Sequence, residues 1–378
     1  MSMRVAIIAD VLGEENNGTS ITVKRLIKYL KQRGHEVLVV SPGICNEEGY
    51  YPVDCIDFKV FNNYVRKNGV VLAKPNEKLL RDVISRSDVV HILMPFSLGR
   101  AAIRICNEMK KPVTTAFHVQ PENVSSHFFL QKSRPINNYI YKNFLKGFYR
   151  YAEYIHCPTE FIANELRRHG YTQDLRVISN GVDPAFVPGT AEKPEQYADK
   201  FCILSTGRLV KEKSQAELIK AIAKSRYAEK IQLFIAGDGP LKSKLEKLGK
   251  KLPNPPVIAF HPKEELVNII HYCDLYAHPA YAEIESIACV EAITCGLVPV
   301  IANSKKSAAR FFARHPSNLY RAGCPADLAR KIDFLIDHPE IRNKQRAEYI
   351  RYAERFRIDL CIDKMIEMFR DAIEGRHP

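Results

Sequence analysis

The fold of this chain is decided by the stretch Ala282-Glu283-Ile284-Glu285-Ser286-Ile287-Ala288-Cys289-Val290-Glu291-Ala292. Small and apolar residues continue from there to Gly296, and residues 297–301 form an apolar run. This pattern predicts a loop, a short helix that begins near Ser286 and ends at Gly296, and then a buried strand.

Two acids frame the predicted start of the helix. Glu283 precedes it, and Glu291 lies about one turn inside it, with seven residues between the two. The free N–H groups at a helix start favour an anion such as a phosphate. Carboxylates accept hydrogen bonds from sugar or ribose hydroxyls. The stretch therefore predicts a phosphate site between two hydroxyl acceptors, unless both acids are merely solvated on an amphipathic helix.

The whole chain sets the class of protein. Its 378 residues favour two domains, and 46% hydrophobic with 26% charged residues is typical of a soluble globular protein. No apolar run approaches the roughly 20 residues that span a membrane, and residues 1–4 lead directly into a strand, so we expect no signal peptide. Ten cysteines without a Cys-x-x-Cys pair favour reduced thiols in a cytosolic protein.

The net charge of +13 indicates an anionic partner, which is a nucleic acid, an anionic membrane surface or a phosphorylated substrate. No zinc-finger, RNA-recognition or helix-turn-helix signature accompanies this charge, so we expect no nucleic-acid partner. A generally basic soluble protein without any such partner remains the alternative.

The first half begins as a β-α-β unit. The run 4–10 predicts a buried strand, the polar loop 14–20 contains Gly18, and a helix over 21–32 leads to the next strand. The loop lacks the Gly-x-Gly-x-x-Gly pattern, which disfavours a nicotinamide dehydrogenase. His118 directly follows a predicted strand, where ligands bind in open α/β sheets, although a structural loop histidine is the alternative.

Residues 132–154 mix basic and aromatic side chains. A basic helix with an aromatic face lies on an anionic membrane in some proteins. Equally, the aromatic face of such a helix packs on a sheet. Residues 188–194 lack periodicity and contain two prolines and a glycine, so we predict a linker there.

A second series of β-α units begins at residue 201. Gly207 and Arg208 follow its first strand, Lys213 comes five positions later, and Gly237 follows the strand 232–236. In a doubly wound sheet these positions face the same crevice as the 282–292 stretch. Two cations and a helix N-terminus at one place predict a diphosphate site. The tail from Ala326 is predicted to be helical.

These motifs in this order resemble glycosyltransferase family 4. The resemblance covers nearly the whole chain, and Glu283-x7-Glu291 is its most specific motif. It implies the α/β fold called GT-B, with two facing Rossmann-like doubly wound domains and a final helix that crosses back to the first. The implied domains are an acceptor domain over 1–190, a sugar-nucleotide domain over 200–356, and the returning helix over 357–378.

The resemblance also implies roles for individual residues. Arg208 and Lys213 would hold the donor diphosphate, Glu283 and His118 would contact the donor sugar, and Glu291 would bind the ribose. The remaining expected donor contacts are Gly18, Gly237, Glu285 and the backbone N–H groups of Ser286 and Ile287. Of these, Glu285 is unusual, because the family has Glu-Gly-Phe-Gly where this chain has Glu283-Ile284-Glu285-Ser286. Either Glu285 contacts the sugar or acceptor, or the loop has another shape.

The implied reaction is a retaining hexosyl transfer by front-face attack, with a donor phosphate oxygen taking the acceptor's proton. Without an Asp-x-Asp motif, we expect no metal and no cofactor, with Arg208 and Lys213 stabilising the leaving group. The expected donor is UDP-glucose or UDP-galactose, and the expected acceptor is a diacylglycerol-type lipid at the inner face of the cell membrane. The alternatives are a saccharide or polyprenyl-linked acceptor, and a non-catalytic sugar-nucleotide binder.

Overall fold

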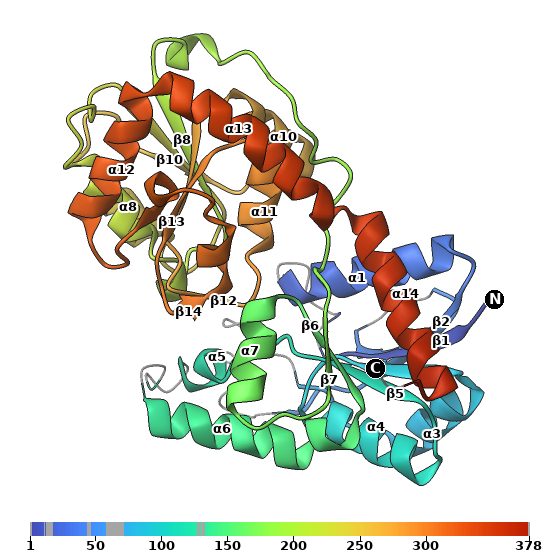
Figure 1. Ribbon diagram of the computed structural model, residues 1–378. Coiled ribbons are helices and arrows are strands. Elements are labelled where there is room, and N and C mark those ends of the chain that lie inside the picture. Colours follow the sequence, from blue (N-terminus) through green and yellow to red (C-terminus); the bar gives the residue numbers. More distant parts are fainter. Residues whose placement is uncertain are drawn as a thin grey trace. The chain divides into compact units, whose positions relative to one another are not determined.

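The structure is a computed structural model in which residues 2–10, 12, 18–43, 47–57, 72–126, 130 and 133–376 are described. The chain divides into two compact units. The first contains residues 1–180 and 359–378, and the second contains residues 181–358. Each unit is a parallel sheet covered by helices (Figure 1), which confirms the predicted α/β class.

The sheet of the first unit has the strand order β3-β2-β1-β4-β5-β6-β7, and its neighbouring strands are parallel. The order reverses between β1 and β4, which makes this the topological switch point. The strands are β1 Arg4–Ile8, β2 Glu36–Pro42, β3 Tyr50–Val53, β4 Val89–Ile92, β5 Val113–Ala116, β6 Tyr154–Cys157 and β7 Asp174–Val177.

The helices of the first unit join and cover these strands. They are α1 Gly18–Gln32, α3 Glu77–Arg86, α4 Ser97–Glu108, α5 Pro121–Ser126, α6 Arg134–Gly147, α7 Glu160–Arg168 and the C-terminal α14 Ile358–Glu374. Helix α14 joins this unit by contacts far apart in sequence: Asp371 pairs with Arg176 at 2.9 Å, and Phe369 packs on His91 with ring centroids 5.3 Å apart.

The second unit has the strand order β10-β9-β8-β11-β13-β15, with its switch point between β8 and β11. Its strands are β8 Phe201–Thr206, β9 Ile231–Ala236, β10 Val257–Ala259, β11 Leu275–His278, β13 Pro299–Ala302 and β15 Leu319–Tyr320. Two short strands, β12 Ala282–Glu283 and β14 Lys306–Ser307, form a separate two-stranded parallel sheet. They follow β11 and β13, respectively, in the chain. The helices of the second unit are α8 Gln215–Ile222, α9 Lys242–Gly249, α10 Lys263–Tyr272, α11 Ile287–Thr294, α12 Pro325–Asp337 and α13 Pro339–Ala353.

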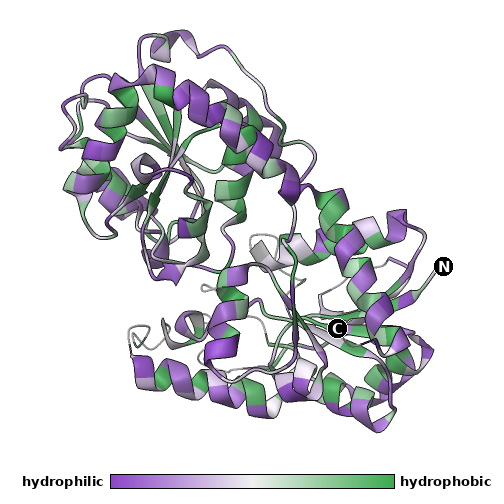
Figure 2. Cartoon of the chain, in the orientation of Figure 1, coloured by the Kyte–Doolittle hydropathy of each residue, from purple (hydrophilic) through white to green (hydrophobic). Residues whose placement is uncertain are grey.

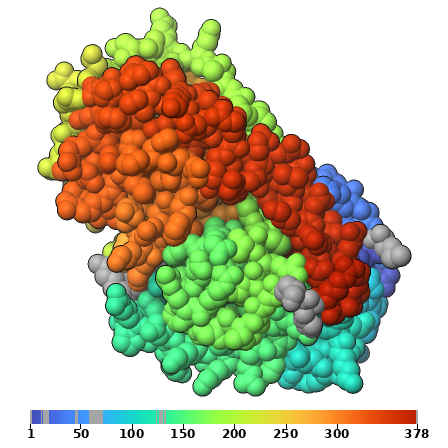
Figure 3. All heavy atoms as spheres, viewed as in Figure 1, coloured from blue at the N-terminus to red at the C-terminus, as the bar shows by residue number. Residues whose placement is uncertain are grey.

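The continuous apolar runs explain why these strands are central. Every residue of β9 and β13 is buried, as expected for parallel strands that are covered on both faces. The hydrophobic colouring of the strands, against the mixed colouring of the outer helices, shows this separation (Figure 2). In the space-filling view, the red surface of α12 and α13 covers one side of the second unit (Figure 3).

The division between the units falls earlier than the predicted linker at 188–194. That segment belongs to the second unit, where Arg346 donates a hydrogen bond to the Gly189 carbonyl at 2.7 Å. The ring nitrogen Nε2 of His271 lies 2.9 Å from the Val187 carbonyl. The lack of periodicity therefore marked an irregular segment that packs on one unit, and not the boundary.

Helix α6 settles which way the basic, aromatic segment packs. Tyr141 and Phe144 are buried, and Phe117 stacks on Tyr141 at a centroid distance of 6.1 Å. The interpretation that the aromatic face packs inside the unit is therefore confirmed for these rings. The opposite face carries exposed cations, and Tyr139 on it is 69% exposed.

Candidate active site

The candidate site of the second unit lies at its switch point. The loops after β8 and β11 leave neighbouring parallel strands at their carboxyl ends, where ligands bind in open α/β sheets. The first of these loops carries Arg208 and Lys213, and the second carries Glu283. Sequence spacing predicted this convergence, and the strand order confirms that the two loops are neighbours.

The loops after β8 and β9 touch through their backbones. A Cβ atom at Gly237 would lie 2.1 Å from the carbonyl oxygen of Gly207, so no other residue fits at position 237 without a shift. The Leu209 amide donates to the Asp238 carbonyl at 2.8 Å, which ties the two loops together. The predicted donor-contact glycine therefore shapes the edge of the site.

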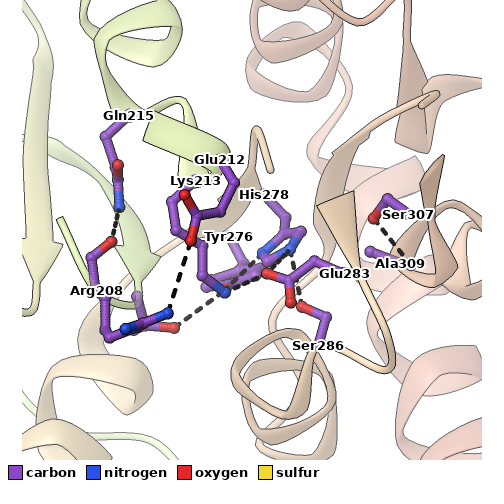
Figure 4. A network of polar contacts seen from close by, with 11 residues as sticks. Arg208, Glu212, Lys213, Gln215, Tyr276, His278, Glu283, Ser286, Ser307 and Ala309 are labelled. Atoms are coloured by element: carbon purple, nitrogen blue, oxygen red, sulfur yellow. Dashed lines mark hydrogen bonds and ion pairs between the residues drawn. The ribbon is translucent and has the colours of Figure 1, made fainter. Parts of the chain in front are cut away.

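Lys213 and Glu283 form a buried ion pair between the two loops (Figure 4). Their side chains are only 18% and 12% exposed. Burial by itself raises the pKa of Glu283, but the Lys213 ammonium and a hydrogen bond from His278 outweigh it and lower this pKa to about 2. Glu283 is consequently a carboxylate at neutral pH, which accepts hydrogen bonds only.

Arg208 points along the same loop and is more exposed. Its guanidinium lies 3.6 Å from the Glu212 carboxylate, and half of its side-chain surface is open to solvent. The Gln215 amide donates to the Arg208 carbonyl at 3.0 Å, which fixes the backbone of the loop (Figure 4). A cation held loosely by one acid is available to an incoming phosphate.

Helix α11 begins at Ile287, as the sequence predicted, and Ser286 precedes it in the left-handed conformation with φ 69°. The first N–H groups of a helix have no partner inside it, so they are available to an anion. Glu291 lies on the second turn and is half-buried. Glu285 is 3% exposed in the loop before the helix, and its contact with a sugar or an acceptor stays a prediction.

The sequence did not single out a group of buried polar side chains behind Glu283. His278 ends β11, its Nε2 lies 2.8 Å from the Ser286 hydroxyl oxygen and 3.4 Å from Oε1 of Glu283, and its Nδ1 lies 3.2 Å from the Tyr276 hydroxyl. Burial lowers the pKa of His278, although Glu283 opposes the shift. The sequence signal for this group was the pair Tyr276 and His278, two polar residues at alternate positions of one buried strand.

In the first unit, His118 follows β5 and is buried. Burial, and then the nearby His156, lower the pKa of His118 to about 3, so the imidazole is neutral. The two rings meet edge to face at 5.5 Å. A neutral imidazole donates one hydrogen bond and accepts another, which suits contact with a sugar hydroxyl, while its alternative role as a structural histidine remains open.

Gly18 is the first residue of α1, which therefore begins three residues before the predicted helix. The rest of the predicted glycine loop, residues 14–17, lies outside the described residues. Asp10 lies two residues after β1, at the switch point of the first sheet, and was not singled out from the sequence. Burial raises its pKa to about 7, although the Ala73 amide donates to it at 3.1 Å.

Comparison with known proteins gives the family. Residues 16–186 match the model of Glycosyltransferase Family 4, and residues 190–356 match the model of Glycosyl transferases group 1. The chain belongs to glycosyltransferase family 4. It is a hexosyltransferase with the GT-B fold, as predicted.

Relatives with known names differ in donor and acceptor. A GDP-mannose-dependent alpha-mannosyltransferase of Corynebacterium glutamicum is 27% identical over 313 residues, which are 79% of this chain and 72% of the relative. An alpha-monoglucosyldiacylglycerol synthase of Streptococcus pneumoniae is 23% identical over 319 residues, 80% and 71% of the two chains. The structure of Anabaena HepE with UDP and glucose has a TM-score of 0.74 over 98% of this chain and all of HepE, at 18% identity.

Two features of the described residues concern metal binding and the membrane. No cluster of three or more His, Cys, Asp or Glu side chains among them has an arrangement that would hold a metal ion. None of the helices in that part of the chain combines the length and apolarity that a membrane span requires. The stereochemical outcome, the donor, the acceptor and the place in the cell stay predictions.

Proposed function

We propose that this glycosyltransferase moves glucose or galactose from a UDP-sugar to a diacylglycerol-type lipid, with retention of configuration. The observation that carries the donor side is the buried Lys213–Glu283 pair at the switch point, beside the loops joined at Gly237. Lys213 would provide a cation for the diphosphate, and the ionised Glu283 in contact with it would provide a hydrogen-bond acceptor for the sugar. The alpha-monoglucosyldiacylglycerol synthases among the relatives support the lipid acceptor.

In the proposed reaction the bond between the anomeric carbon and the diphosphate breaks, and negative charge develops on the leaving phosphate. Arg208 and Lys213 would stabilise that charge, together with the first N–H groups of α11. The acceptor hydroxyl attacks from the same face and loses its proton to a donor phosphate oxygen. This route needs no enzymic nucleophile and no residue that acts as a base.

The outer face of α6 supports a peripheral contact with anionic lipid. Lys142 and Lys146 on α6 are exposed, and so is Arg150 in the short 3-10 helix Tyr149–Tyr151 that follows α6. Tyr139 on α6 and Tyr151 after it are 69% and 44% exposed. The helix lies on the surface of the first unit (Figure 1). Each basic side chain near an anionic surface contributes about 1 kcal/mol to binding, so three together would strengthen it by on the order of 100-fold.

One experiment tests donor, acceptor and stereochemistry together. The protein is incubated with UDP-glucose, UDP-galactose and GDP-mannose, each with diacylglycerol in vesicles, and products are identified by mass and by the NMR coupling of the anomeric proton. We expect an alpha-hexosyl diacylglycerol from a UDP-sugar. A beta-linked product would contradict retention, and hydrolysis of the donor without any glycolipid product would contradict the lipid acceptor.

The membrane contact has its own test. Changing Lys142, Lys146 and Arg150 to Glu should abolish sedimentation with phosphatidylglycerol vesicles, since three attractive charges become repulsive. A matched control reverses three exposed lysines on or beside α9 of the second unit, Lys244, Lys247 and Lys250. If both triple variants lose vesicle binding equally, net charge and not α6 carries it.

GDP-mannose is the second candidate donor, because of the names of several relatives. Several relatives are named as GDP-mannose-dependent mannosyltransferases, among them the Corynebacterium enzyme and a Mycobacterium tuberculosis phosphatidylinositol dimannoside mannosyltransferase. Mannosyl transfer from GDP-mannose to a lipid-linked acceptor is therefore the alternative function. Turnover of GDP-mannose, with none of either UDP-sugar, would establish it in place of the first proposal.

A further inference from the structure

A buried chain of polar side chains lies behind the Lys213–Glu283 pair. Thr206 ends β8, and its Oγ1 lies 2.9 Å from the Tyr276 hydroxyl on the neighbouring strand β11. That hydroxyl lies 3.2 Å from Nδ1 of His278, two positions along the same strand and therefore on the same face. Tyr276 is fully buried, and His278 is 2% exposed.

The far side of the imidazole faces the candidate donor site. Nε2 of His278 lies 2.8 Å from the Ser286 hydroxyl oxygen and 3.4 Å from Oε1 of Glu283 (Figure 4). Both neighbours belong to the loop between β11 and α11, which the family resemblance places against the donor sugar. One buried side chain of the sheet thus contacts both of these loop residues.

The Glu283 carboxylate favours one tautomer of His278. An ionised Glu283 accepts only, so a proton on Nε2 of His278 suits both this carboxylate at 3.4 Å and the Ser286 hydroxyl oxygen at 2.8 Å. In that tautomer Nδ1 accepts from the Tyr276 hydroxyl, whose oxygen accepts in turn from Thr206. The donors all point toward Glu283, and successive hydrogen bonds in such a chain polarise one another.

Ser286 also has a conformation that needs support. It is one of three residues other than glycine with positive φ among the described residues, with φ 69° and ψ 61°. A side chain disfavours that region, and residues held there are over-determined by their surroundings. The contact with His278 is such a constraint, because it ties the Ser286 hydroxyl to the rigid strand β11.

We propose that His278 is a positioning residue for the donor sugar. Its Nε2–H tautomer, set by Tyr276 and Thr206, holds the Glu283 carboxylate and the Ser286 hydroxyl in the arrangement that receives the hydroxyls of the transferred hexose. The inference rests on the proposed function, since Glu283 must contact that sugar. In this proposal His278 does not contact the diphosphate. Variants of His278 should therefore lower the rate of sugar transfer without lowering the affinity for the nucleotide.

The test compares His278→Leu, His278→Gln and Tyr276→Phe in the full-length protein. His278→Leu should lower kcat for the sugar that the wild type transfers by about 10- to 100-fold, because reacting groups lose their alignment. Its affinity for UDP alone, or for GDP if GDP-mannose is the donor, should stay within about twofold by calorimetry. His278→Gln should recover part of kcat, since its amide nitrogen replaces Nε2–H as a donor.

Tyr276→Phe keeps the ring and removes only the hydroxyl, so it tests the chain without opening the core. We expect a smaller loss of kcat, of about 3- to 10-fold. Nitrogen NMR of labelled histidine should show the Nε2–H tautomer of His278 in the wild type and a mixture in this variant. His315→Gln, which changes a histidine bonded to Glu348 at 2.6 Å in the same unit, is the control and should keep kcat.

Two results would overturn the inference. Wild-type kcat in a folded His278→Leu protein would show that positioning is not needed. Equal losses of kcat, nucleotide affinity and melting temperature, without recovery in His278→Gln, would show a purely structural histidine. Failure of the proposed function looks different: the wild type itself would turn over no donor, while the NMR tautomer of His278 would still respond to Tyr276→Phe.

Discussion

Replacing Lys213 with Met should reveal how strongly the site depends on its buried ion pair. The change keeps the apolar stem and removes the ammonium. Glu283 has its pKa lowered from the ordinary 4.5 to about 2 in the folded protein. Because one pKa unit corresponds to about 1.4 kcal/mol, the surroundings of Glu283, with burial opposing its partners, favour the ionised form by a net amount on the order of 3 kcal/mol.

The loss should depend on pH with a definite sign. Glu283 has a folded pKa below its unfolded one, so in the wild type its contribution is present above about pH 4.5 and is lost as the pH falls toward 2. Without Lys213, burial dominates and raises the folded pKa instead. The carboxylate then destabilises the variant increasingly as the pH rises from 4.5 to 7.

The assay is urea unfolding of four proteins at pH 7 and pH 4.5: wild type, Lys213→Met, Glu283→Gln and the double variant. We expect Lys213→Met to lower the unfolding free energy by about 3 kcal/mol at pH 7 and by less at pH 4.5. In the Glu283→Gln background it should cost under about 1 kcal/mol, because no buried charge remains.

A second, more exposed ion pair in the same unit provides the control. Lys263 pairs with Asp183 at 2.7 Å but is about half exposed, so Lys263→Met should cost less than about 1 kcal/mol at either pH. The reasoning is refuted if the coupling of Lys213 with Glu283 is below about 0.5 kcal/mol at pH 7. It is equally refuted if Lys213→Met costs the same at both pH values.

Three further predictions concern binding and packing. Glu291→Gln should weaken UDP binding by about 10-fold in calorimetry, because the ribose loses a charged acceptor, and unchanged affinity would place the ribose elsewhere. Gly237→Ala should lower stability by about 1–3 kcal/mol and weaken UDP binding, since its Cβ would meet the Gly207 carbonyl at 2.1 Å; a wild-type melting curve would contradict this. Gly181→Ala should lower the melting temperature without altering UDP affinity, because φ is +74° and the new Cβ would lie 2.6 Å from Ile358. A drop in UDP affinity there would mean that the strain reaches the donor site.

The strands and the loops between them could be predicted because each has a local sequence pattern, an apolar run for a strand and glycine or polar residues for a loop. Continuous apolar runs predicted β8 at 201–206, and Gly296 marked the end of α11. The partner of Glu283 could not be predicted in this way, since Lys213 lies 70 positions away and only the strand order brings them together. His278 was missed because its sequence signal, a polar residue two positions after Tyr276 in a buried strand, does not show which loop residues it contacts.

Ser286 is the described residue that relates most directly to the two alternatives for the loop 283–286, a new contact by Glu285 or a different loop shape. The family has a glycine where this chain has Ser286, and Ser286 still adopts φ 69°, a conformation that glycine reaches without strain. The backbone there has a conformation that favours glycine, so the serine at this position has not required an ordinary extended or helical backbone. The serine adds a hydroxyl that His278 holds, next to the buried Glu285. A site that hydrogen-bonds the hydroxyls of its substrate rejects analogues that cannot make those bonds, so sugar selectivity in this enzyme should be sought at these two added groups.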